Sequence, residues 1–131
     1  ALRQVRNCTV VESLISSSEG SVNFAKMERG MQGYSRIVST RNHPHVSVQQ
    51  ALTLDKVLRM HSAPAVMDYL SLDVESHELA VLKSFPFHSY RWQVISIETV
   101  VPQLEATLAQ HGYIHVLAVT HPLPSGNKKK L

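Results

Sequence analysis

The fold is decided by ten residues near the middle of the chain, Ser71-Leu72-Asp73-Val74-Glu75-Ser76-His77-Glu78-Leu79-Ala80. Residues 66–74 form a nearly continuous apolar run, which is typical of a strand buried on both faces in a parallel sheet. Ser76 is a favoured N-cap residue, so a helix is expected to begin there. The helical spacing of Leu79, Leu82 and Phe85 predicts about three turns. The stretch therefore predicts a buried strand that leads directly into a crossover helix.

The segments on either side alternate between the two kinds of element. Apolar and β-branched runs predict strands at residues 8–15, 21–24, 46–51, 92–98 and 113–119. One helix is expected to begin after Thr53 as N-cap, and another at Pro102, ending before Gly112. This alternation predicts an α/β fold with mostly parallel strands joined by crossover helices.

Composition limits the class of protein. The chain has 131 residues, 44% of them hydrophobic and 18% charged, which predicts one globular domain over residues 1–120. Residues 121–131 are expected to be a disordered basic tail, and its three lysines alone match the formal net charge of +3. The rest of the chain lacks the basic surface of a nucleic-acid-binding protein, and no apolar run reaches the ~20 residues of a membrane span. Cys8 is the single cysteine, which predicts a reducing compartment, the cytoplasm.

Three acidic side chains are expected at neighbouring strand ends. Asp73 and Glu75 lie two residues apart at the end of one strand, so their side chains should point the same way. Glu98 ends the next strand, and ligands of open α/β sheets bind outside these carboxyl ends. Such carboxylates could orient a substrate, act as a general base or hold a metal ion. The simpler alternative is that they only close the strands in solvent.

Histidines add one candidate to this group. His77 lies just after Asp73 and Glu75 and is expected to reach the same crevice, where it would contact a substrate. The eight histidines and one cysteine show no zinc-ligand spacing, and no glycine-rich phosphate loop is present. We therefore predict no dedicated metal site, and an ion held by Asp73, Glu75 and Glu98 stays the least favoured alternative.

Several segments, in this order and spacing, resemble the FkbM family of S-adenosylmethionine-dependent methyltransferases. Residues 8–24 are similar to the family's third strand and the hairpin after it. The other matching segments are Leu52-Thr53-Leu54-Asp55-Lys56-Val57-Leu58, Asp68-Tyr69-Leu70-Ser71-Leu72-Asp73-Val74-Glu75, Val94-Ile95-Ser96-Ile97-Glu98 and residues 108–113. The resemblance implies a class I methyltransferase (Rossmann-like) sheet and methyl transfer to an oxygen of a small molecule or sugar.

The resemblance also assigns roles to residues. Asp73, Glu75 and Glu98 are implied as catalytic residues on the acceptor side of the methyl group. Three residues of the segment after the third strand, Glu12, Ser13 and Ser16, are implied to contact the cofactor, S-adenosylmethionine. The methyl acceptor is expected to be a small molecule.

The chain departs from the family pattern in ways that keep alternatives open. The family's opening strand, glycine-rich loop and second strand would precede Ala1, so the sheet is expected to lack its first strands and this chain alone to be inactive. Ser76 stands where the family usually has glycine. The alternative is a non-catalytic binding or scaffold domain that forms homo-oligomers through an exposed sheet edge.

Overall fold

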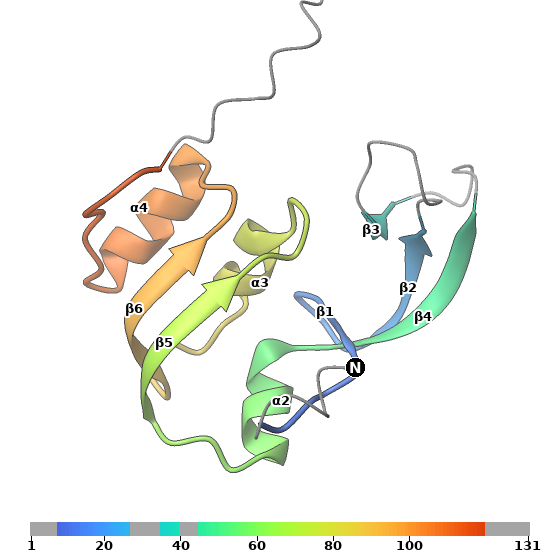
Figure 1. Cartoon of the computed structure of the whole chain (residues 1–131), viewed down its shortest axis with the longest axis horizontal. Coiled ribbons are helices and arrows are strands. Elements are labelled where there is room, and N and C mark those ends of the chain that lie inside the picture. Colours follow the sequence, from blue (N-terminus) through green and yellow to red (C-terminus); the bar gives the residue numbers. More distant parts are fainter. Residues whose placement is uncertain (1–7, 27–34, 40–44, 120–131) are drawn as a thin grey trace, which may run out of the picture.

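The computed structural model describes residues 8–26, 35–39 and 45–119 (Figure 1). Strands and helices follow one another in the order β1 (Leu14–Ile15), β2 (Gly20–Ala25), β3 (Arg36–Val38), β4 (Val46–Leu52), α2 (Leu54–Met60), β5 (Val66–Leu72), α3 (Glu78–Lys83), β6 (Arg91–Ile97) and α4 (Pro102–Gln110). Strands and helices alternate from β4 onward, as an α/β fold requires. The predicted tail, residues 121–131, lies outside the described residues.

The strands form two separate sheets (Figure 1). In the first, the order is β1-β4-β2-β3, with β1 parallel to β4 and β2 antiparallel to both β3 and β4. In the second, β5 and β6 lie parallel, and α3 connects them. Among the described strands, two of the four pairings are parallel and two are antiparallel, so the sheets are mixed rather than mostly parallel.

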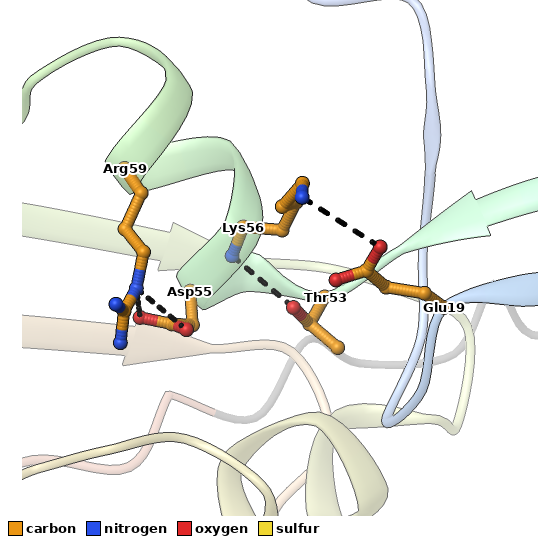
Figure 2. Close-up of polar contacts among 5 residues, drawn as sticks. All are labelled: Glu19, Thr53, Asp55, Lys56 and Arg59. Atoms are coloured by element: carbon orange, nitrogen blue, oxygen red, sulfur yellow. Dashed lines mark hydrogen bonds and ion pairs between the residues drawn. The ribbon is translucent and has the colours of Figure 1, made fainter.

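Helix α2 lies in the connection from the first sheet to the second and begins as the sequence predicts. The Thr53 side chain accepts a hydrogen bond from the Lys56 backbone N–H at 3.1 Å (Figure 2). Arg59 Nε donates to both carboxylate oxygens of Asp55, at 2.9 and 3.0 Å, one turn along the helix. Lys56 also lies 4.0 Å from Glu19, which ties the helix to the turn before β2 (Figure 2). Solvent screens these exposed pairs, so they orient α2 more than they stabilise it.

The core lies around β5 and β6, where α3 and α4 bury their apolar faces. Its buried residues are Leu72, Val81, Leu82, Phe85, Trp92 and Leu104. Leu82 and Leu104 are fully buried, and the Phe85 ring stacks on Trp92 with 4.5 Å between centroids. Burying a large apolar side chain contributes about 1.5–3 kcal/mol, so this cluster holds both helices on the sheet.

Helix α3 differs from the prediction. It has six residues rather than about three turns, and the N-cap position is His77, not Ser76. Ser76 has φ 70, in the left-handed region, whereas N-cap residues typically have extended backbone. The helix ends at Lys83, and the Ser84 hydroxyl donates to the Val81 carbonyl at 2.9 Å.

Two predicted strands are shorter or absent. Of residues 8–15, Leu14 and Ile15 form the strand, and Cys8 is exposed. Residues 113–119 form no strand. Ile114 and Val116 are 84% and 81% exposed, so the β-branched pattern finds no partner strand within the described residues. Strand β3 was not predicted at all.

Tyr113 meets the edge of β6 with its side chain instead. Its hydroxyl accepts from the Trp92 N–H at 3.1 Å and donates to the Trp92 carbonyl at 3.0 Å. The Arg91 guanidinium lies over the Tyr113 ring, 4.9 Å from its centroid. Gly112, with φ 78, provides the left-handed residue expected after α4, which turns the chain toward β6. No helix of the described ranges is long and apolar enough to cross a membrane.

We predict that Tyr113→Phe destabilises the protein by about 1–2 kcal/mol, because both bonds to Trp92 are lost while the ring remains. Thermal unfolding followed by circular dichroism should show the melting temperature falling by about 4–8 °C for each kcal/mol of lost stability. Tyr90→Phe is the matched control, since the Tyr90 hydroxyl makes no hydrogen bond within the described part of the chain. Equal melting temperatures for the two variants would contradict the prediction.

Candidate functional site

Three carboxylates gather at the carboxyl ends of β5 and β6. Asp73 directly follows β5 and Glu98 directly follows β6. Because the strands are parallel and Leu72 pairs with Ile97, the two acids leave the sheet side by side. Glu75 joins them, and carboxylate oxygens of the three residues all lie within 4.8 Å of one another. The expected closeness of Asp73, Glu75 and Glu98 is therefore observed, while their catalytic role stays a prediction.

The route by which Glu75 reaches this group differs from the predicted one. Strand β5 ends at Leu72, so Asp73 and Glu75 do not share a strand face. Instead, Glu75 has φ 54 and Ser76 has φ 70, both in the left-handed region. Each non-glycine residue in this region costs roughly 1–2 kcal/mol. Strain of this kind persists only where the surrounding structure imposes it, and it is frequent at functional sites.

A fourth carboxylate holds the turn from below. Glu78 is buried, with 2% of its surface exposed, and its Oε1 accepts a hydrogen bond from the Val74 N–H at 3.1 Å. This bond spans the two strained residues, Glu75 and Ser76. Glu78 was not among the predicted site residues. Its position four residues after Val74, in the first turn of the helix, is the signal that could have identified it, because a carboxylate there can accept a hydrogen bond from the preceding backbone.

The crowding of the carboxylates changes their affinity for protons. The pKa of Glu98 lies above its usual 4.5, first because of its hydrogen bond with Asp73 and then because of the Asp73 charge. The pKa of Glu75 is also raised, first by desolvation and then by the charges of Asp73 and Glu78. A carboxylate with a raised pKa accepts a proton more readily, so both are better general bases than an ordinary glutamate.

His77 lies beside this group, but its ring reaches a different partner. Its Nε2 lies 3.4 Å from the Ser16 hydroxyl oxygen. Ser16 is only 4% exposed, and its N–H donates to the Leu52 carbonyl at 2.9 Å. The structure thus brings a residue predicted to contact substrate, His77, together with one predicted to contact cofactor, Ser16. The two are 61 residues apart, and no sequence signal linked them.

The other two residues expected at the cofactor precede β1. Ser13 is partly buried and its hydroxyl donates to the Leu14 carbonyl at 3.4 Å. Glu12 is exposed. Their contact with S-adenosylmethionine stays a prediction.

The arrangement has two chemical uses. Oxygen ligands this close could share a divalent cation after small side-chain movements. They could equally bind a cationic organic group or take a proton from a hydroxyl, because two of them have raised pKa values.

Comparison with known proteins gives one match. Residues 5–115 match the family model described as the methyltransferase FkbM domain. No curated protein and no solved structure matches the chain. The matched range contains every residue of the candidate site, from Glu12 to Glu98.

We predict that Ser76→Gly stabilises the chain by about 0.5–1 kcal/mol, because glycine adopts φ 70 without the cost that Cβ imposes. Its greater freedom in the unfolded chain offsets part of the gain. Urea unfolding measures the difference in unfolding free energy. Ser76→Ala is the control, since it removes the hydroxyl but keeps Cβ and should give no gain; an equal gain from alanine would refute the role of backbone strain.

We also predict a pH-dependent gain in stability from Glu98→Gln. Between the unfolded pKa of Glu98, about 4.5, and its raised pKa in the fold, the folded chain retains a proton at Glu98 that the unfolded chain has lost. The contribution of Glu98 to stability therefore falls as pH rises from about 4.5 through the raised pKa. Glutamine removes this loss, so the variant should melt higher than the parent at neutral pH, with the difference shrinking towards pH 4.5.

Melting curves at a series of pH values test this. Glu19→Gln is the control, because it neutralises an exposed acid outside the cluster; it loses the ion pair with Lys56, so it should give no gain in melting temperature at neutral pH. A Glu98→Gln gain that does not change with pH would show that charge repulsion is not its cause.

Proposed function

We propose that this chain, which belongs to the FkbM methyltransferase family, forms the acceptor side of an enzyme that methylates an oxygen of a small molecule or sugar. The observation that carries the proposal is the convergence of Asp73, Glu75 and Glu98 at the ends of two adjacent parallel strands. The family match supports a methyltransferase-like function, and the three carboxylates are the groups that could orient the reactants and accept a proton.

The donor set suits S-adenosylmethionine. When bound, this cofactor supplies an electrophilic methyl group on a sulfonium cation. A group of carboxylates within 4.8 Å of one another attracts such a cation and orients it. For the adenosine part of the cofactor, we propose contacts with Glu12, Ser13 and Ser16. These contacts extend the site toward the first sheet.

The acceptor hydroxyl must lose its proton as its oxygen becomes methylated. Either Glu98 or Glu75 takes this proton, because the pKa values of both are raised and both carboxylates belong to the same cluster. Asp73 accepts a hydrogen bond from protonated Glu98, so it holds that carboxyl in place and sustains its affinity for the proton. The three acids thus divide the work of orientation and proton removal.

We predict that Asp73→Asn lowers methyl transfer by about 100-fold or more, because an amide can neither attract the cation nor sustain the basicity of Glu98. Transfer of a labelled methyl group to a panel of sugars and hydroxylated small molecules is the assay. Asp68→Asn is the matched control. It makes the same change on β5 at an exposed site, where Asp68 accepts a hydrogen bond from Gln93, and should leave the rate within about twofold.

Two results would contradict the proposal. Turnover retained in Asp73→Asn would remove this residue from the site. The absence of both methyl transfer and S-adenosylhomocysteine binding in the parent chain would end the methyltransferase proposal.

A second candidate function, an oligomeric scaffold, rests on a separate observation. Ile114, Val116 and Leu117 are 84%, 81% and 73% exposed, and the cross-strand neighbours Tyr69 and Val94 are 58% and 57% exposed. A monomer rarely leaves so much apolar surface in water. We predict that the chain sediments as a homo-oligomer and that Val116→Lys shifts it to monomer; sedimentation as a monomer before any substitution would exclude this function.

A further inference from the structure

The acidic turn between β5 and α3 is held at both ends. At its start, the Val74 N–H donates to Glu78 at 3.1 Å. At its end, the His77 ring meets the Ser16 hydroxyl at 3.4 Å, and the His77 carbonyl accepts from Val81 N–H at 3.1 Å. Glu75 and Ser76, the two left-handed residues, lie between these anchors. A turn that carries this strain relaxes when a restraint is removed.

The Ser16 end of the contact is fixed in the first sheet. Ile15 pairs with Leu52, and the Ser16 N–H donates to the Leu52 carbonyl at 2.9 Å. The Ser16 side chain has almost no exposed surface, so its hydroxyl cannot swing into solvent as a surface serine does. The contact therefore links a residue fixed beside β1 and β4 in the first sheet to the N-cap residue of α3, the helix that connects the two strands of the second sheet.

We propose that Ser16 and His77 form a clamp that couples the proposed cofactor segment to the carboxylate turn, with His77 as a positioning residue. The coupling rests on the proposed function, since it assigns Ser16 to the cofactor side and Glu75 to the acceptor side. A cofactor bound along the segment of Glu12, Ser13 and Ser16 shifts Ser16 and thereby weakens its contact with His77. Release of His77 lets the turn shift Glu75 relative to Asp73 and Glu98.

The coupling is reciprocal by thermodynamic necessity. If cofactor binding at Ser16 alters the turn, then whatever fixes the turn alters cofactor affinity by the same factor. The clamp thereby makes the geometry of the three acids depend on whether the cofactor segment is occupied. It gives His77 a role other than the substrate contact that its place in the sequence suggested.

The clamp is tested first without any ligand, by amide hydrogen exchange and backbone chemical shifts in NMR. Ser16→Ala and His77→Ala should each speed exchange at Val74 about tenfold and shift the Glu75 and Ser76 resonances, while the Leu82 amide in α3 stays near its parent rate. His77→Gln, which can still bond Ser16, should restore most of the protection.

The control is Ser84→Ala, which removes a hydroxyl bond of 2.9 Å at the other end of α3. It should leave Val74 exchange within about twofold of the parent. A uniform loss of protection in all variants would show that His77 only stabilises the fold, and unchanged Val74 exchange in Ser16→Ala and His77→Ala would overturn the clamp.

The coupling is tested by titration with S-adenosylhomocysteine. It should shift the Glu75 and Ser76 resonances in the parent and lose that effect in His77→Ala. Binding that leaves these resonances unmoved, or moves them equally in both proteins, would overturn the coupling. No binding at all would contradict the proposed function and the coupling with it, while the exchange data would still decide whether the clamp exists.

Discussion

The parallel pairing of β5 with β6 is the constraint on which the rest of the structure depends. Its register, Leu72 opposite Ile97, places the next residue of each strand, Asp73 and Glu98, side by side. The core keeps the register, since Leu72 and Trp92 pack with the α3 and α4 residues Leu82 and Leu104. A slip by one residue would move every side chain of a strand to the other face, so the core and the acid pair are specified together.

The carboxylate site lowers stability in two ways that the surrounding structure must offset. Desolvation and then neighbouring negative charges raise the pKa of Glu75, and the hydrogen bond with Asp73 and then its charge raise the pKa of Glu98. Two consecutive residues also take left-handed backbone without being glycine. Buried Glu78 and the apolar faces of α3 and α4 supply the compensation. Sites that carry function commonly retain such local costs, because the geometry they impose is the geometry the chemistry needs.

Local signals in the sequence predicted the local parts of the fold. Thr53 caps α2 because its hydroxyl needs only the N–H three residues later. The apolar runs of β5 and β6 are equally local, and they placed Asp73 and Glu98 correctly. Ser76 failed as a cap because nothing in a serine shows that its backbone will have positive φ. Residues 113–119 have a strand's composition but no partner strand in the part of the chain that the structure describes, since pairing depends on distant segments.

The separation along the chain of the contacting residues also orders the steps of folding. The β5-α3-β6 unit closes a short loop, and the three acids belong to it or directly follow it. The pairing of Leu14 with Ala51 closes a longer loop, and the Ser16 contact with His77 spans 61 residues. Because loop closure costs more entropy as the loop lengthens, the acid cluster forms early and the link between the two sheets forms late. During refolding, the three carboxylates are therefore gathered before the first sheet is joined to them.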